Sequence, residues 1–210
     1  MRNIAFTLLV APLLACTAAP EVPSQTHQAA STVPPEGAGF IENVAYAGTG
    51  CPENSASSGV SPDKQVVTSI FSAFVAEKGG ASDPTKASLA CLVMIDVNVP
   101  AGFQYALESV HHRGFAGLQS EVTATRQSLY MISGRPLLVS APVKFKGAQD
   151  KDYTNADVEA TTPALWSPCG GGQVLWVATK IEVSNGGRAS RSGQLTVDTI
   201  DTEIIWRRCQ

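Results

Sequence analysis

The chain has 210 residues, a formal net charge of −3 at pH 7, and only 16% charged residues. Phosphate binding needs clustered Lys and Arg, and the sequence has no such cluster, so we expect no nucleic-acid partner. Gly, Ser, Thr and Val are plentiful, which is typical of an extracellular β protein rather than a helical one.

The first fifteen residues have the pattern of an export signal. Met1-Arg2-Asn3 is a short basic start, and an apolar run follows from Ile4 to Leu14. This run has the length of a signal peptide and is too short for a membrane-spanning helix. We therefore predict a signal peptide over residues 1–15 and an exported protein.

The apolar run ends in Leu13-Leu14-Ala15-Cys16, which resembles the lipobox of bacterial lipoproteins. We predict that Cys16 carries lipid, so that the membrane is a partner and the protein is anchored at the cell envelope. Thr17 stands where an Asp would retain a lipoprotein in the inner membrane, so a cell with two membranes should send the protein to the outer one. The alternative is an ordinary secretory signal that is cut after Ala18 or Ala19.

The next segment, residues 16–47, reads as a flexible tether. It is rich in Ala, Pro, Ser and Thr and has few large apolar residues, so it cannot bury enough surface to offset the entropy of ordering. The remaining residues, 48–210, have the size of one ordinary domain.

Four cysteines lie in this domain, namely Cys51, Cys91, Cys169 and Cys209. An even number in an exported chain predicts two disulfides. Zinc is the competing interpretation, but the domain has no Cys-x-x-Cys pair and no His at ligand spacing, so we expect no metal and no cofactor.

Two segments of alternating polarity suggest how the cysteines pair. Gln173–Ser184 and Gln194–Arg208 read as strands, and the glycines between them are typical of a turn. A hairpin of these strands would bring Cys169 opposite Cys209. We therefore predict Cys169–Cys209 and, by remainder, Cys51–Cys91.

Further strand candidates fill the rest of the domain. Val66–Val75 fits helical spacing as well as strand alternation, and periodicity alone does not decide between them. Turn residues separate the other candidates at Pro100-Ala101-Gly102, Arg113-Gly114 and Ser133-Gly134. The pattern predicts an all-β fold, an antiparallel β-sandwich of about seven or eight strands stapled by two disulfides. The candidate strands are Val93–Val99, Phe103–Val110, Val122–Ile132 and Val143–Lys146.

The domain has only two histidines, His111 and His112, and it lacks a Gly-x-Ser-x-Gly elbow. Two neighbouring residues of one strand point to opposite faces, so this pair is unsuited to joint catalysis, and a surface imidazole is the simpler interpretation. His112 stays a ligand-binding candidate. Arg113 is another, because it could bind a carboxylate or phosphate, although a lone Arg more often covers apolar surface or meets a nearby acid.

Asp198 and Asp201 could act as paired carboxylates in glycoside hydrolysis or bind calcium, if a bulge near Thr199-Ile200 turned them to one face. Hydrogen bonding to local backbone is the simpler role. Trp176 lies on the strand face opposite Leu175, so it either fills a second packed face or is exposed to bind a ligand.

Motifs along the domain, in order, resemble the family known as domain of unknown function 4360. This resemblance implies an exported, cysteine-paired β domain, favours a strand over Val66–Val75, and implies no established activity. The chain departs from the family pattern at His111-His112 and at Thr202. The matching motifs are Gly48-Thr49-Gly50-Cys51-Pro52, Phe71 and Phe74, Cys91, Pro100-Ala101-Gly102-Phe103, Arg113-Gly114 with Ala116, Asp152-Tyr153, Ser167-Pro168-Cys169-Gly170, Asp198-Thr199-Ile200-Asp201 and Trp206-Arg207-Arg208-Cys209.

The leading functional hypothesis is a non-enzymatic, membrane-tethered β-sandwich that binds an envelope or extracellular glycan or protein, or serves structurally at the cell surface. The alternative is a polysaccharide hydrolase that uses Asp198 or Asp201 with His112 nearby. An enzyme should show convergent polar groups in a cleft, whereas a binding module should show a shallow aromatic patch.

Overall fold

The computed structural model describes residues 34, 39–82, 84–133, 135, 138–157 and 166–209. The predicted signal peptide, Cys16 and most of the predicted tether lie outside these residues. Strands dominate the described part, and its one helical segment is a 3-10 turn, η1 (Pro84–Ala87). No helix there is long and apolar enough to cross a membrane.

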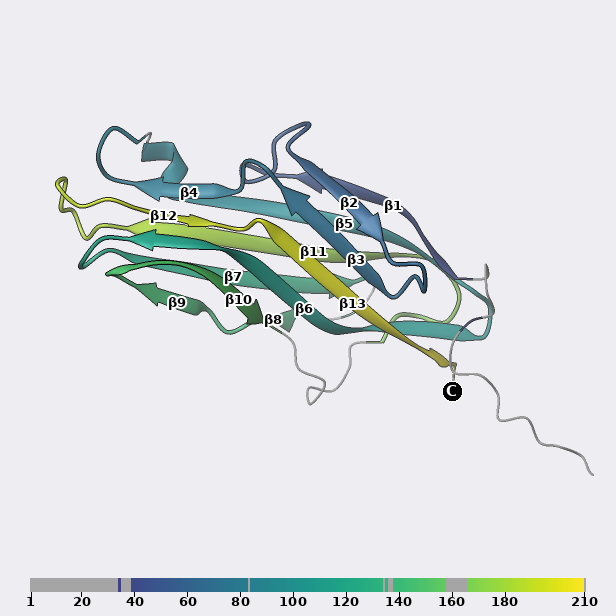
Figure 1. Ribbon diagram of the computed structural model, residues 1–210. Coiled ribbons are helices and arrows are strands. Elements are labelled where there is room, and N and C mark those ends of the chain that lie inside the picture. The colour runs from purple at the N-terminus through teal and green to yellow at the C-terminus, as the bar shows by residue number, and fades with distance from the viewer. Residues whose placement is uncertain are drawn as a thin grey trace, which may run out of the picture. The chain divides into compact units, whose positions relative to one another are not determined.

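The first layer, called sheet A, contains six strands (Figure 1). Their order is β1-β5-β11-β7-β8, and β9 pairs with β7 beside β8. All of these pairings are antiparallel. The strands are β1 (Phe40–Ala47), β5 (Ser88–Val99), β7 (Thr123–Ile132), β8 (Leu138–Val139), β9 (Val143–Lys146) and β11 (Gly171–Ser184).

The second layer, called sheet B, contains seven strands, and β3, β13 and β6 pass in front of sheet A in Figure 1. The order is β2-β3-β13-β6-β12-β4, with β10 on the other edge of β6, and again every pairing is antiparallel. The strands are β2 (Ala56–Val60), β3 (Val66–Phe71), β4 (Val75–Lys78), β6 (Phe103–Leu118), β10 (Gln149–Ala156), β12 (Gly193–Thr196) and β13 (Thr199–Arg208).

The apolar core lies between the two sheets, as the sequence alternation predicts. Alternate residues of β5 and β11 are buried, and β6 and β13 supply the facing side chains. Each fully buried aliphatic or aromatic side chain of this kind contributes about 1.5–3 kcal/mol to folding. The buried residues that the alternation identified are Val93, Ile95, Val97, Val99, Leu175, Val177, Ile181 and Val183.

These layers confirm the all-β antiparallel sandwich, but the described residues form thirteen strands rather than seven or eight. One reason is that strands expected to be continuous are interrupted. The segment Gln194–Arg208, for example, forms β12 and β13, with a break at Val197-Asp198. The segment Val66–Val75 contains the strand β3, as the family resemblance implies.

Both predicted disulfides are confirmed, with Cα–Cα distances of 5.4 Å for Cys51–Cys91 and 5.9 Å for Cys169–Cys209. The predicted hairpin behind the second pairing is wrong. β11 pairs with β5 and β7 in sheet A, whereas β12 and β13 lie in sheet B. Alternation identifies the buried face of a strand but not its partner, and here the disulfide joins the ends of strands in different sheets.

Two boundaries also differ from the sequence prediction. Phe40–Ala47 is the last part of the predicted tether, and the lower polarity of Phe40–Tyr46 suggests packing on the domain edge; the segment is the edge strand β1 and pairs with β5. Arg113-Gly114, which was predicted to be a turn, lies inside β6. Glycine is required there because a Cβ atom at Gly114 would lie 2.2 Å from the backbone oxygen of Thr196. The turn at Pro100-Ala101-Gly102 is confirmed between β5 and β6.

β6 contains one extra residue relative to its partner β13. Ser109 pairs with Glu203 and Leu107 pairs with Ile204, so Glu108 forms a β-bulge between them. Before the bulge all positions from Phe103 to Leu107 are buried, with the odd-numbered ones, such as Tyr105, in the apolar core, and after it the buried positions have even numbers. This change of phase decides which side chains of β6 reach the outer surface of sheet B.

Candidate functional site

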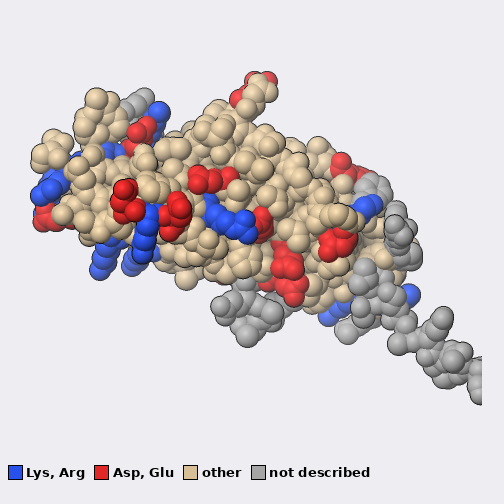
Figure 2. Space-filling view, in the orientation of Figure 1, with Lys and Arg blue, Asp and Glu red and all other residues tan. Residues whose placement is uncertain are grey.

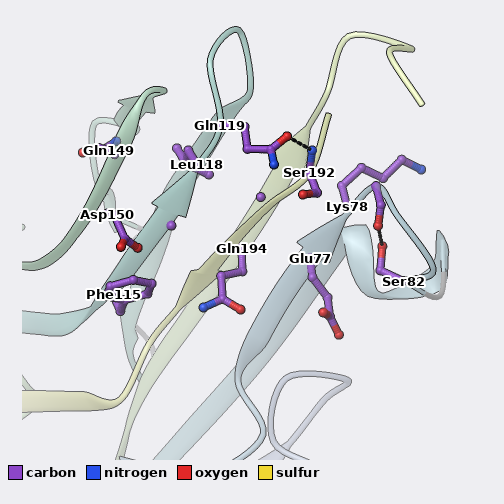
Figure 3. A pocket seen from close by; sticks show the side chains of 13 residues that line it. Glu77, Lys78, Ser82, Phe115, Leu118, Gln119, Gln149, Asp150, Ser192 and Gln194 are labelled. Atoms are coloured by element: carbon purple, nitrogen blue, oxygen red, sulfur yellow. Dashed lines mark hydrogen bonds between the residues drawn. The ribbon is translucent and has the colours of Figure 1, made fainter. Parts of the chain in front are cut away.

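A groove of about 460 Å³ lies on the outer face of sheet B, where β4, β12, β6 and β10 run side by side (Figure 3). We call it the β12 groove. Figure 3 shows Gln194 in its centre, with Phe115 and Asp150 on one side and Glu77 on the other. The other lining residues are Lys78, Gly79, Ser82, Gly117, Leu118, Gln119, Gln149, Ser192 and Gly193.

Strand alternation and register bring these side chains together. Because Ala116 and Leu195 are buried in the core, their neighbours in β6 and β12 point outward. Gln194 pairs with Glu77 on β4 and with Gly117 on β6, and Gly117 pairs in turn with Asp150 on β10. Polar groups from distant parts of the sequence therefore form one row across four strands.

The missing side chain at Gly117 gives the groove its floor. A Cβ atom at this position would lie 2.8 Å from the ring of Phe115 and 3.4 Å from the Asp150 carboxylate, so the ring leans over the glycine. Asp150 and Gln194 have no hydrogen-bond or ion-pair partner among the described residues. The groove thus offers one aromatic face together with an uncommitted carboxylate and an uncommitted amide.

Other lining groups are held in place. The side-chain oxygen of Gln119 accepts a hydrogen bond from the backbone N–H of Ser192 at 3.0 Å, which fixes one end of the groove. Glu77 accepts from Lys86 at 3.2 Å, in an exposed ion pair. Sequence reasoning missed this groove because its residues converge only through the register of four strands.

Two of the predicted candidates meet elsewhere on the outer face of sheet B. Arg113 and Asp201 form an ion pair at 2.8 Å, with side-chain exposures of 57% and 14%. The hydroxyl of Thr68 donates to the other oxygen of Asp201 at 2.7 Å, so both carboxylate oxygens are engaged. Asp201 therefore binds neighbouring side chains rather than the local backbone.

Asp198 lies in the break between β12 and β13, directly before the predicted bulge at Thr199-Ile200, and its side chain is exposed. Its backbone N–H donates to the carbonyl of Arg113 at 2.8 Å. Figure 2 shows acidic side chains across this face of the molecule, with basic side chains between several of them. No group of three or more His, Cys, Asp or Glu among the described residues is placed to bind a metal ion.

Trp176, the predicted aromatic candidate, is 39% exposed and lies on the outer face of sheet A. Its cross-strand neighbours are Met94 on β5 and Met131 on β7. Trp176 is therefore on the opposite sheet from the β12 groove and from Arg113 and Asp201.

His111 and His112 point to opposite faces of β6, as predicted. His111 is half-buried, whereas His112 is fully buried, so the surface imidazole expected for both describes neither ring well. The His112 ring lies between the sheets, where its Nε2 is 3.1 Å from the hydroxyl of Thr179 and 3.2 Å from that of Ser128. His112 therefore cannot reach a ligand on the outer surface.

His112 belongs to a buried polar cluster that spans the core, made of His112, Arg126, Ser128, Tyr130, Asp157 and Thr179. The guanidinium of Arg126 donates to both oxygens of Asp157, at 2.6 and 2.5 Å. The hydroxyl of Tyr130 donates to the same carboxylate at 2.6 Å. Both charged side chains are almost completely buried, at 0% and 1% exposure.

Burial fixes the charge states in this cluster. It lowers the pKa of His112 to about 3, and the charge of Arg126 acts in the same direction, so the imidazole is neutral at pH 7. Burial alone would raise the pKa of Asp157, but the hydrogen bonds and charge of Arg126 outweigh it and lower that pKa. The core thus holds one ionised Arg–Asp pair beside a neutral imidazole.

The alternation in β7 carries a signal that could have revealed this cluster. Ala124, Arg126, Ser128, Tyr130 and Ile132 occupy successive inward positions, so an arginine stands in the middle of a core-facing row. A cation at such a position requires a buried acid, because an unpaired charge is too costly to bury.

Comparisons with known proteins agree with the sequence resemblance. The family model described as "Domain of unknown function (DUF4360)" matches residues 39–209. An "Uncharacterized secreted protein" of the fungus Arthroderma benhamiae is 30% identical over 244 residues, which cover 100% of this chain and 99% of that protein.

Two solved structures align with this chain at low scores. TmCBM61 in complex with beta-1,4-galactotriose aligns with a TM-score of 0.27 and 12% identity over 81% of this chain and 91% of its own. A CBM4 structure aligns with a TM-score of 0.22 and 10% identity over 79% and 86%. These scores support no statement about ligands. The family match and the fungal relative, by contrast, cover almost the whole domain, and the chain belongs to the DUF4360 family.

Proposed function

We propose that the protein is an exported binding module, attached to the membrane through Cys16, that holds a neutral or amino-bearing saccharide in the β12 groove. The observation that carries this proposal is the aromatic ring of Phe115 over Gly117, beside the uncommitted Asp150 and Gln194.

The chemistry of the groove suits a hydroxyl-rich ligand. A carboxylate accepts hydrogen bonds, and an amide both donates and accepts, so together they match sugar hydroxyls. An aromatic face packs against the apolar C–H face of a sugar ring. The row crosses four strands spaced about 4.8 Å apart, which gives a span of ~14 Å, enough for a short segment of a chain.

The charges of the groove narrow the ligand class. Among the described residues, Asp150 has no ion-pair partner, Glu77 pairs with Lys86, and Lys78 is the one basic residue in the lining. An acidic sugar would bring its carboxylate against that of Asp150, which costs free energy. Neutral sugars and amino sugars avoid this repulsion.

The location at the cell envelope rests on separate support. The fungal relative is described as secreted, which supports export of this chain. The lipobox-like Leu13-Leu14-Ala15-Cys16 supports a lipid anchor, and Thr17 after the cysteine supports the outer membrane where one exists.

A glycan array with neutral and amino-bearing oligosaccharides tests the groove. We expect Phe115→Ala to weaken the strongest interaction about tenfold or more, as loss of a central aromatic contact does. Trp176→Ala is the matched control, because it removes an exposed aromatic side chain from the other sheet. Loss of binding in Trp176→Ala with full binding in Phe115→Ala would place the site on sheet A and contradict the proposal.

Cell fractionation tests the anchor. Cys16→Ser removes the thiol that would accept lipid, so the protein should move from the membrane fraction to the soluble exported fraction. The folded domain, followed by its disulfides, should be unchanged. An identical distribution of the two proteins would show that Cys16 does not anchor the chain.

A further inference from the structure

A second hollow, of about 570 Å³, lies between the free edges of β9 and β10. β9 pairs only with β7, and β10 pairs only with β6, so each strand leaves one edge unpaired among the described residues. The rings of Phe145 and Tyr153 meet across the gap with centroids 4.8 Å apart. The two sheets are thus open at this edge above an aromatic floor.

Three lysines line this opening, which we call the lysine cleft. Lys144 and Lys146 come from β9 on one lip, and Lys151 comes from β10 on the other. None of the three has an ion-pair partner among the described residues, whereas Lys86, Lys180, Arg113, Arg126 and Arg188 each have one. The single acid in the lining is Asp152. Although the protein has a net negative charge, three lysines without an ion-pair partner in the described part of the chain lie at one opening.

The cleft also holds a polar atom without a partner. The side-chain oxygen of Asn155 is buried in the lining and accepts no hydrogen bond from the described residues. The hydroxyl of Tyr153 is committed to the backbone oxygen of Thr196 at 2.6 Å, which fixes the ring. The cleft thus has a fixed ring in its lining, a buried amide oxygen without a partner among the described residues, and three lysines on the two strands that form its lips.

We propose that the lysine cleft binds an acidic saccharide, whose carboxylate, sulfate or phosphate groups pair with Lys144, Lys146 and Lys151. The ring and the amides match sugar faces and hydroxyls, and the lysines match the anionic oxygens. A flat membrane surface does not fit between two strands. The residues that carry this inference differ from those of the β12 groove, so either site can exist without the other.

Lysines on edge strands also have a simpler role, which is to prevent edge-to-edge aggregation. Binding measurements on the purified full chain separate the two roles. The probe is an oligogalacturonate, compared with its fully methyl-esterified form of equal length, and dextran sulfate is the second acidic arm. We expect the two acidic probes to bind at low salt and the esterified one to bind at least tenfold more weakly. Acid binding should weaken as salt rises toward 0.15 M, where screening is strong.

The decisive variants are Lys146→Gln and Lys151→Gln, which remove charge but keep a polar chain. Each should weaken binding of the acidic probes about tenfold, as loss of one charge-assisted contact does. Lys180→Gln is the matched control, because this lysine lies on β11 and pairs with Glu182. The affinity of the Lys180→Gln variant for the acidic probes should stay within about twofold of that of the wild-type protein.

Three results would overturn the inference. If Lys180→Gln lost as much affinity for the acidic probes as the cleft variants, the attraction would be non-specific. If Lys146→Gln and Lys151→Gln aggregated more but bound the probes as wild type does, the lysines would only protect the strand edges. Equally tight binding of poly-glutamate would exclude a saccharide-specific cleft. The neutral oligosaccharides that report on the β12 groove should bind the lysine variants as they bind wild type, so the two sites are tested separately.

Discussion

The molecule contains two Arg–Asp pairs with the same chemistry in opposite surroundings. Arg126 and Asp157 are fully buried and join sheet A to the end of β10 in sheet B. Arg113 and Asp201 lie on the outer face of sheet B, where Arg113 is more than half exposed. Water can solvate either member of the exposed pair when the other is absent, but it cannot do so in the core. We therefore expect the buried pair to contribute far more to stability than the exposed one.

The sharpest way to break this comparison is to neutralise the buried acid. Asp157→Asn keeps the shape of the side chain but leaves the Arg126 cation unpaired in the core. The free energy of unfolding, measured by urea denaturation, should fall by about 3–5 kcal/mol. Replacing both residues by apolar ones, Arg126→Met with Asp157→Leu, should recover much of that loss. If Asp157→Asn lowered the free energy of unfolding by less than about 1 kcal/mol, water would have to reach the pair.

A change of pH should distinguish the two pairs next, because the imidazole beside the buried pair is itself fully buried. The pKa of His112 is about 3 in the folded protein and near 6.5 in the unfolded chain. Between pH 3 and pH 6.5 the unfolded chain therefore binds a proton on this residue that the folded protein does not bind. The unfolding free energy should therefore fall as the pH drops from about 6.5 toward 3, with a slope of up to ~1.4 kcal/mol per pH unit from this residue.

The matched variant for the pH experiment is His112→Gln, which can still hydrogen-bond Ser128 and Thr179 but does not titrate. Denaturation curves at pH 7, 5 and 4 should show a flatter dependence in this variant than in wild type. The stabilisation from Asp157, whose pKa is lowered, is lost only below its ordinary value of 3.8. The same slope in both proteins would mean that His112 becomes protonated without unfolding.

The smallest effect is expected at the exposed pair. Asp201→Asn should change the free energy of unfolding by less than about 1 kcal/mol, because solvent and salt already screen the charges. The difference from wild type should shrink further in 1 M salt. A loss as large as that of Asp157→Asn would mean that the hydrogen bond from Thr68 and the Arg113 contact act as one structural unit.

Sequence reasoning identified the fold class, the disulfides and much of the core because alternation directly reports which face of a strand is buried. Leu175, Val177, Ile181 and Val183 followed this rule. The sheet partner of β11 did not follow from it, since a strand with one buried face fits a hairpin as well as the opposite layer of a sandwich. The correct Cys169–Cys209 pairing therefore came from a wrong local picture.

The candidate site was less predictable. Arg113 and Asp201 were singled out as separate candidates and lie together, but nothing in their spacing identified one as the partner of the other. Phe115, Asp150 and Gln194 are far apart in the chain and meet only through strand register. The burial of His112 depends on the bulge at Glu108, because continued alternation from Tyr105 would have turned His112 outward.

That bulge makes β6 unequally sensitive to changes in chain length. Removal of Glu108 would straighten the strand and leave each later side chain on its present side, since the residue is surplus to the pairing with β13. Removal of His111 would instead move the Arg113 cation into the core, turn Gly114 toward solvent, and move every later side chain up to Leu118 to the opposite face. β6 should therefore tolerate the loss of one residue at Glu108 but not the loss of one residue at His111, three positions later.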